Sequence, residues 1–392
     1  MKNNLIYTLL VWLVLMSGST SCGLIEDKGT GNKNYTPPTP LVITEAEKQH
    51  YSALLSNYFD STLLGPYRSF SGGLLVAKGG TILYEQYQGF EDLPGRSRAI
   101  SATSSIHIAS STKPFTAFAI LKLVDQKKLS LTDTINQFFP TLPYPSITVR
   151  DLLTHRSGLP NYLYFMEASS WNKERMATNQ DVLQVMSTEQ PARHAPPNKR
   201  FEYCNTNYVL LALLIEKLSG VSYPRYMQET IFEPLGMKHT FVYQPKHAKR
   251  STPSYQPNGR LWPLDYLDLT YGDKNIYSTP QDLLKWDQAL YTDQLIDTAL
   301  LQQAFQGYSF ERPGTHHYGL GFRLEFLRNG KKVIYHFGRW HGNNAAFTRL
   351  IEEKVVVIIL GNRFNRGIYS AAHHSYDLFG NYYNQDERED DQ

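Results

Sequence analysis

Cysteine is scarce in this chain of 392 residues, which contains only Cys22 and Cys204. Two cysteines can form one disulfide at most, so a small disulfide-stapled scaffold is excluded. Net charge is also low, because 39 lysine and arginine residues stand against 36 aspartate and glutamate residues. A net charge of +3 is too slight to indicate a nucleic-acid partner, and none is expected. Hydrophobic residues make up 41% of the chain, which is enough for a large folded core.

Long apolar runs are absent beyond the first 22 residues, so no later segment is expected to span a membrane. The chain starts with the basic Met1–Asn4, continues with the apolar run Leu5–Met16, and then has small residues up to Cys22. This run would span roughly 18 Å as a helix, short of the roughly 30 Å hydrocarbon core of a bilayer. Residues 1–21 are therefore predicted to be a signal peptide.

Cys22 directly follows these small residues and resembles the cysteine at which bacterial lipoproteins are cleaved and lipidated. Ser19 departs from the leucine usual at its position, and ordinary secretion with cleavage nearby is the alternative. The resemblance implies export and a lipid anchor in a bacterial membrane, on the periplasmic or cell-surface side. Residues 22–43, which include the proline-rich Thr36–Pro40, are predicted to be a flexible tether. The acidic residues 386–392 are predicted to be a solvated tail.

The body of the chain, residues 44–385, has the pattern of an α+β domain. Helical spacing is found over residues 43–58, where Thr44 is a plausible cap, and over residues 110–128. Strand-like runs form a hairpin around Gly79-Gly80 and return near the C-terminal end, over residues 72–89, 318–326, 332–337, 345–351 and 355–360. Because strands occur near both ends, one sheet built from both ends is expected. The prediction is a sheet lobe over about 44–128 and 271–385, with a mainly helical lobe over about 129–270 inserted between.

A serine and a lysine, Ser110 and Lys113, lie three residues apart at a predicted helix start. Residues i and i+3 share a helix face, so the lysine amine can lie beside the serine hydroxyl. Pro114 supports the placement, because proline is tolerated only in the first turn of a helix. There the backbone N–H of Ser110 is free to bind a developing oxyanion. A second copy of the pattern, Ser170–Lys173, lies in a polar stretch and is predicted to be surface loop.

Two further motifs follow in order, Tyr203-Cys204-Asn205 and His336-Phe337-Gly338, the second at the end of an apparent strand. Competing copies are Tyr382-Tyr383-Asn384, predicted to lie on the surface, and His317-Tyr318-Gly319, which precedes the expected strand. A serine–lysine helix start, a Tyr-x-Asn loop and a basic-x-Gly strand in this order are far more specific than any one alone.

In these motifs the chain resembles the serine hydrolases related to β-lactamases and penicillin-binding proteins, especially the branch of class C β-lactamases, D-alanyl peptidases and esterases. Residues 147–160 and 276–283 are also similar to segments of that family, and the similarity covers about residues 44–380. The resemblance implies a β-lactamase/transpeptidase-like fold, with an antiparallel sheet flanked by helices and an inserted mainly helical lobe. It also implies acyl transfer through a covalent serine ester.

The resemblance assigns the catalytic roles to Ser110, Lys113 and Tyr203. Ser110 is the expected nucleophile, and its proton must be removed by a neighbouring base. Lys113 can act as that base only in its neutral form, which burial and nearby positive charge favour. Tyr203 is the second candidate base or a proton relay, and the choice between the two stays open. Asn205 is expected to offer its amide to the substrate carbonyl and to Lys113.

The substrate-binding residues implied by the resemblance are Asn205, His336, Gly338 and Arg339. The oxyanion hole is expected to use the backbone N–H groups of Ser110 and Arg339. Lysine is usual where His336 stands, and histidine is largely neutral at pH 7. Arg339 supplies the lost positive charge if its side chain points to the site. Efficient β-lactam hydrolysis is therefore less expected than turnover of a small ester or a D-alanyl peptide of the cell wall. The alternative is a non-catalytic cell-wall or penicillin-binding lipoprotein of the same fold.

No metal or cofactor is expected. Histidines are paired at His316-His317 and His373-His374, but His-Glu-x-x-His is absent, and adjacent histidines rarely bind one metal together. Phosphate-binding glycine motifs are also absent, and so is the Gly-x-Ser-x-Gly of α/β-hydrolases.

Overall fold

The computed structural model describes residues 35–65, 68–311 and 314–383. The signal peptide, the lipidation site Cys22 and the acidic tail lie outside these residues and stay predictions. Within the described ranges, no helix has both the length and the apolar character needed to cross a membrane.

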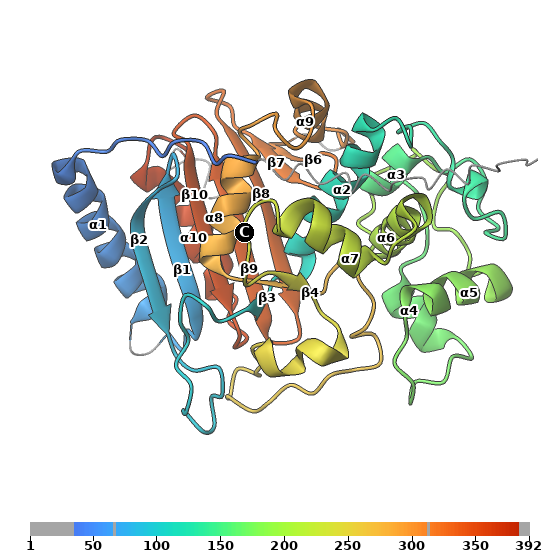
Figure 1. Cartoon of the computed structure of the whole chain (residues 1–392), viewed down its shortest axis with the longest axis horizontal. Coiled ribbons are helices and arrows are strands. Elements are labelled where there is room, and N and C mark those ends of the chain that lie inside the picture. The colour runs from blue at the N-terminus through green and yellow to red at the C-terminus, as the bar shows by residue number, and fades with distance from the viewer. Residues whose placement is uncertain (1–34, 66–67, 312–313, 384–392) are drawn as a thin grey trace, which may run out of the picture. The chain divides into compact units, whose positions relative to one another are not determined.

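One antiparallel sheet of seven strands forms the centre of the fold, and both ends of the body contribute to it (Figure 1). Its strand order is β2-β1-β10-β9-β8-β7-β6. The strands are β1 (Gly72–Lys78), β2 (Thr81–Gln88), β6 (His316–Tyr318), β7 (Arg323–Phe326), β8 (Lys332–Trp340), β9 (Asn343–Leu350) and β10 (Val355–Gly361). The predicted α+β fold, with a sheet made from the two ends of the chain, is confirmed.

Helices cover both faces of this sheet. Alternate residues of a strand point to opposite faces. In β1, Leu74 and Val76 join the core that includes α1 and α10, whereas Leu75 and Ala77 join the core that includes α2 and α8. These helices are α1 (Glu45–Phe59), α2 (Lys113–Asp125), α8 (Pro280–Ala289) and α10 (Gly367–His374). Thr44 caps α1 as predicted, because its hydroxyl accepts a hydrogen bond from the backbone N–H of Glu47.

The chain between α2 and α8 is mainly helical, as expected. Its helices are α3 (Val149–Leu153), α4 (Tyr162–Ala168), α5 (Asn179–Glu189), α6 (Thr206–Ser219) and α7 (Tyr223–Met227), and α9 (Thr298–Ala304) follows α8. Short turns of 3₁₀ or π type are η1 (Asp60–Leu64), η2 (Ala109–Thr112), η3 (Ile135–Gln137), η4 (Gln228–Phe232), η5 (Pro245–Arg250) and η6 (Tyr376–Leu378). A small sheet that the sequence did not predict joins β3 (Ile106–His107), β5 (Ile276–Ser278) and β4 (Phe241–Val242). The boundaries between the two lobes stay a prediction.

Two strand assignments from the sequence were wrong in detail. The predicted strand 318–326 is a hairpin of β6 and β7, because Gly321 has a φ of +87° and packs so closely on α2 that a Cβ atom would lie 2.3 Å from that of Ala117. The strand expected to end near residue 337 continues to Trp340, where it pairs with Asn343 of β9. The His-Phe-Gly motif therefore lies inside β8, paired with its neighbour over its whole length.

Candidate active site

The turn that carries Ser110 joins the small sheet to helix α2. Ala109, the first residue of η2, has a φ of +48°, a conformation that residues other than glycine adopt rarely and that concentrates at functional sites. Two hydrogen bonds hold this turn: the N–H of Ala109 donates to His107 Nδ1 at 3.0 Å, and Ser111 Oγ donates to the carbonyl of His336 at 2.9 Å. Ser110 is partly exposed, whereas Ser111 is buried. Ser110 is therefore the serine of this turn that a substrate can reach.

Lys113 is fully buried and its amine lies at the centre of the predicted motifs. Its Nζ is 3.1 Å from Ser110 Oγ, 2.9 Å from Asn205 Oδ1 and 2.9 Å from the carbonyl oxygen of Asp273. A neutral amine has two N–H donors and one lone pair. When the two acceptors of Asn205 and Asp273 take the donors, the lone pair is left for the proton of Ser110. The arrangement therefore suits proton abstraction by Lys113.

Tyr203 lies against the same amine. Its ring centroid is 4.9 Å from Lys113 Nζ and 5.2 Å from the guanidinium carbon of Arg323. The ring also packs on that of His155, with centroids 4.3 Å apart. The phenol ring of Tyr203 therefore lies beside both the amine of Lys113 and the guanidinium of Arg323. The structure thus brings together the predicted residues Ser110, Lys113, Tyr203 and Asn205, although their chemical roles stay predictions.

Gly338 places β8 directly against the serine turn. A Cβ atom at this position would lie 2.4 Å from the carbonyl oxygen of Ile108 and 2.8 Å from the backbone nitrogen of Ser110. Such a close approach leaves room for glycine alone, and it brings the backbone of Gly338 and Arg339 to the nitrogen predicted to bind an oxyanion. The side chain of Arg339 is exposed and lies 5.9 Å from the ring centroid of Phe364.

Replacing Gly338 by alanine is expected to force β8 and the serine turn apart. Because the added methyl group meets backbone atoms, the expected costs are about 1–3 kcal/mol of folding stability and at least a tenfold loss of kcat. Gly95→Ala is the matched control, since its methyl group would meet only the end of the Asp92 side chain. Thermal unfolding and turnover of an ester substrate measure both effects. Equal behaviour of the two variants would contradict the close approach.

A buried chain of hydrogen bonds runs behind Tyr203, from His155 through Tyr318 to His336. His155 Nδ1 accepts the backbone N–H of Cys204 at 3.1 Å, so the proton of a neutral His155 is on Nε2, 3.2 Å from the Tyr318 hydroxyl oxygen. The Tyr318 hydroxyl then donates to His336 Nε2 at 3.2 Å, and His336 Nδ1 donates to the carbonyl of Phe337 at 2.8 Å. Cys204 is the middle residue of the Tyr-x-Asn motif. This series of hydrogen bonds therefore links the Tyr-x-Asn motif to the strand that carries the His-Phe-Gly motif.

The three side chains joined by these hydrogen bonds, His155, Tyr318 and His336, are held in their neutral forms. Burial, together with the charges of Lys113 and Arg323, lowers the pKa of His155 and of His336 well below the usual value. Burial raises the pKa of Tyr318 well above its usual value. His336 is 0% exposed and offers no cation to a substrate at neutral pH. The predicted contact between its side chain and a substrate is not favoured by this geometry.

A cavity of about 700 Å³ opens beside Tyr203. It is lined by residues 200–203, 309, 311, 316–318, 323 and 335. Both acidic residues of its lining pair with an arginine other than Arg323, since Glu202 contacts Arg200 and Glu311 contacts Arg156. Among the described residues, Arg323 has no carboxylate partner. An arginine without an acidic partner therefore lines the cavity next to the candidate base.

Sequence reasoning missed four residues of the site: Asp273, His155, Tyr318 and Arg323. Asp273 acts through its carbonyl, which no side-chain pattern reveals. Tyr318 was noticed only as part of a competing His-x-Gly copy, and Arg323 is a single charge within a predicted strand. Of the competing copies, Ser170 and Lys173 are exposed as predicted, and Ser170 bonds to Glu189. Tyr382 is buried and bonds to Glu353, so its predicted surface position was wrong.

One group of side chains has the spacing of a metal site. Ligand atoms of Asp265, Asp268 and His341 lie within 4.8 Å of one another, which is the one such group found in the described part of the chain. The carboxylate of Asp268 already accepts hydrogen bonds from Trp340 Nε1, His341 Nε2 and the backbone N–H of Asp265. These donors occupy the lone pairs that a cation needs, so the group is explained as a hydrogen-bonded aspartate–histidine pair.

Comparison with known proteins agrees with this geometry. The profile of the family described as Beta-lactamase matches residues 61–378, most of the chain. The chain therefore belongs to this family of serine hydrolases with the β-lactamase/transpeptidase fold.

Among characterised relatives, the chain is similar to penicillin-binding protein 4* of Bacillus subtilis, with 33% identity over 366 residues that cover 87% of this chain and 79% of that protein. Protein flp of Staphylococcus aureus is 27% identical over 310 residues, which are 74% of this chain and 59% of that protein. The penicillin-binding protein of Bacillus halodurans superposes with a TM-score of 0.71 at 23% identity, covering 83% of this chain and 99% of that one. The D-amino acid amidase of Ochrobactrum anthropi gives 0.69 at 23% identity, covering 82% and 98%. At these identities the structures establish the fold alone.

Proposed function

We propose that this protein is a serine hydrolase that transfers the acyl group of an ester or amide to Ser110 and then to water. The observation that carries the proposal is the buried amine of Lys113, 3.1 Å from Ser110 Oγ and fixed by two further acceptors. A surface lysine would not be held in this way. The same contacts argue against the non-catalytic alternative, which has no need of an amine held beside a reachable serine.

Acylation starts when neutral Lys113 takes the proton of Ser110 and Oγ attacks the substrate carbonyl carbon. The carbonyl oxygen becomes an oxyanion that the N–H groups of Ser110 and Arg339 stabilise. As the tetrahedral intermediate collapses, the bond to the leaving amine or alcohol breaks. The leaving group takes a proton from Lys113, directly or through Tyr203, and the acyl group stays on Ser110.

Deacylation uses the same groups in reverse order. Water gives a proton to Tyr203 or Lys113 and attacks the ester carbon, and the released Ser110 oxygen recovers that proton. Asn205 keeps the Lys113 amine aimed at the serine through both steps, because its Oδ1 accepts from that amine. No cofactor is needed for either step.

Arg323 gives the site a preference for a substrate with a negative charge. Its guanidinium lies 5.2 Å from the ring centroid of Tyr203 and lines the 700 Å³ cavity. A carboxylate on the leaving group would pair with this arginine in a partly buried place, where such a pair is stronger than in water. Arg323 therefore takes the role that the sequence assigned to His336 or Arg339. A D-alanyl peptide with a free C-terminal carboxylate fits this site, and so does a small ester of similar charge.

A panel of substrates tests the proposed function. A peptide that ends in D-Ala-D-Ala, its C-terminal amide, a short p-nitrophenyl ester and nitrocefin are compared for kcat/KM. Turnover of the peptide or the ester is expected, and the comparison with nitrocefin shows whether Arg323 also accepts the carboxylate of a β-lactam. The absence of turnover and of covalent labelling by a fluorophosphonate would support the non-catalytic alternative.

The charge preference is a separate prediction. Replacing Arg323 by methionine is expected to lower kcat/KM for the free-carboxylate peptide by about 10- to 100-fold and to leave that for its C-terminal amide within about threefold. Methionine keeps the apolar stem over Tyr203, so the loss reports the guanidinium. Arg200→Met, at the more exposed edge of the same cavity, is the control and should change the ratio little. An unchanged preference in the Arg323 variant would exclude this role.

We also propose that the protein is exported and anchored by a lipid on Cys22. The support is the sequence of residues 1–22 alone, which lie outside the described structure. Metabolic labelling with a fatty-acid analogue should mark the wild type and not Cys22→Ser. Labelling of both would place the lipid elsewhere.

A further inference from the structure

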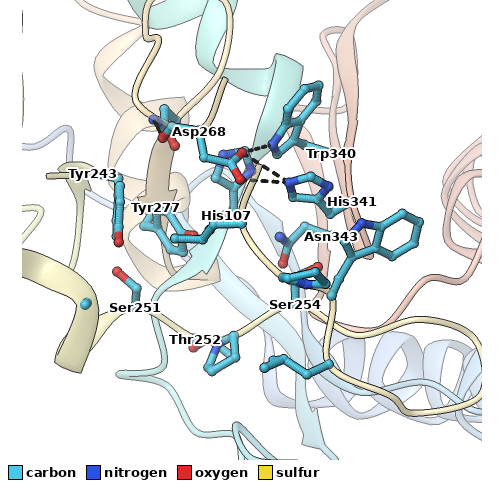
Figure 2. Close-up of a pocket in the computed structure, with 17 residues that line it drawn as sticks. His107, Tyr243, Ser251, Thr252, Ser254, Asp268, Tyr277, Trp340, His341 and Asn343 are labelled. Carbon is cyan, nitrogen blue, oxygen red and sulfur yellow. Dashed lines mark hydrogen bonds and ion pairs between the residues drawn. The ribbon is translucent and has the colours of Figure 1, made fainter. Parts of the chain in front are cut away.

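A second cavity, of about 240 Å³, lies at the C-terminal end of β8, just beyond the His-Phe-Gly motif in the sequence (Figure 2). Its borders are the segments 251–254 and 261–264, together with the turn from β8 to β9. None of the described residues that line the cavity is among those assigned to catalysis. The cavity nevertheless adjoins the serine turn along the chain, because His107 is three residues before Ser110 and Trp340 follows Arg339.

The walls of this cavity are mostly aromatic. The rings are those of Tyr243, Tyr277, Trp262 and Trp340. At the rim, Leu261 is 56% exposed and Leu264 is 57% exposed, so apolar surface continues out to solvent. A volume of 240 Å³ equals that of about eight water molecules in the liquid. Such a space has room for a single ring and offers aromatic faces to pack against it.

Three buried polar atoms of the lining residues have no hydrogen-bond partner within the described structure: His107 Nε2, Thr252 Oγ1 and Asn343 Oδ1. Because His107 Nδ1 accepts the N–H of Ala109, the proton of neutral His107 is on Nε2, which is therefore a donor. Asn343 Oδ1 is an acceptor, and the Thr252 hydroxyl is both. Unpaired buried polar atoms are rare and cost about 1–3 kcal/mol each. A purely apolar ligand would leave all three unpaired.

The cavity has one group of each charge beside it, so it favours neither an anion nor a cation. The carboxylate of Asp268 lies in its wall, bonded to Trp340 Nε1 and His341 Nε2 as Figure 2 shows, and would repel an anion. The buried amine of Lys274 lies 4.6 Å from the ring centroid of Trp340 and would repel a cation. A ligand for this place is therefore uncharged, carries hydroxyl or amide groups, and has flat faces.

From these observations we propose that the cavity is a second binding site, which takes one neutral sugar ring of a glycan. The ring faces pack on Trp262 and Trp340, and the hydroxyl or acetamido groups pair with His107, Thr252 and Asn343. Binding here does not require acyl transfer at Ser110, so the site stands or fails independently of the proposed activity.

Ligand-observed NMR with the full chain tests the site, using N-acetylglucosamine as probe and phenylacetate as an apolar anionic comparison. We expect saturable binding of the sugar and none of phenylacetate. Trp262→Ala should weaken sugar binding by at least about tenfold. Thr252→Val, which removes only the hydroxyl, should weaken it by about fivefold. Tyr164→Ala removes an aromatic side chain of α4 that is 73% exposed and does not line the cavity, and it should change nothing, as should Ser110→Ala.

Several results would overturn the proposal. Sugar binding that survives in Trp262→Ala would place the ligand elsewhere on the protein. Binding of phenylacetate in place of the sugar would make the cavity an apolar acyl pocket. If neither the sugar nor phenylacetate binds, water is the hydrogen-bond partner of the three polar atoms and the cavity is not a ligand site.

Discussion

Replacing Ser110 by alanine is expected to lower kcat for any substrate of this protein by at least about 10⁴-fold and to abolish labelling by a fluorophosphonate. The hydroxyl forms the covalent bond to the acyl group, and no other group of the site is placed to replace it. The loss should come without unfolding, because Ser110 is partly exposed and alanine fits a position that already follows Ala109. Mass mapping of the labelled peptide, together with steady-state kinetics, measures both effects.

Neighbouring serines provide the controls. Ser111 is buried, and its hydroxyl bonds to the carbonyl of His336, so Ser111→Ala should keep fluorophosphonate labelling while activity falls modestly. Ser170→Ala, in the exposed second copy of the motif, should match the wild type. Labelling that persists in Ser110→Ala and vanishes in Ser111→Ala would move the nucleophile by one residue. That result would contradict the pairing of Ser110 with Lys113.

Much of this site could be predicted from the order of the motifs in the sequence. The residues of the site are either close together in the sequence or occur in motifs whose order is known from the related family. Ser110 and Lys113 share one turn of backbone, so local geometry alone sets their separation. Asn205 was expected to meet Lys113, and the structure places Oδ1 of that residue 2.9 Å from the amine. The general fold could also be predicted, because strand patterns occur near both ends of the body and helical patterns occur between them.

Contacts between residues far apart in the sequence could not be predicted in this way. Arg323 reaches Tyr203 only because the hairpin of β6 and β7 turns at Gly321, and the sequence predicted a single strand there. The neutral state of His336 depends on its burial and on the charges of Arg323 and Lys113, which come from distant parts of the chain. Its function was therefore assigned from the residue type, whereas burial and hydrogen bonding decide its chemistry. The small sheet of β3, β4 and β5 was missed because two of its strands have two residues each, too few for any periodic pattern.

The buried histidines lead to a second large prediction, a loss of folding stability in mild acid. Burial lowers the pKa of His107 to about 3, and it lowers the pKa values of His155 and His336 well below the usual value. In the unfolded chain each histidine has a pKa of about 6.5 and binds a proton as the pH falls below that value. The folded chain takes up no proton there, so acid favours the unfolded state. The stability is fully present above pH 6.5 and is lost progressively below it.

The expected loss between pH 7.5 and pH 5.5 is about 1.4 kcal/mol for each of these histidines, or about 4 kcal/mol in all. That is a large part of the 5–15 kcal/mol typical of folded proteins. Urea unfolding at the two pH values measures it. His107→Gln keeps an acceptor for the N–H of Ala109 and cannot titrate, so its loss should be smaller by about a third. His50→Gln, at an exposed position of α1, should leave the loss unchanged. An equal free energy of unfolding at both pH values would show that these histidines bind protons as readily in the folded protein as in the unfolded chain, which would contradict the neutral hydrogen-bonded residues behind Tyr203.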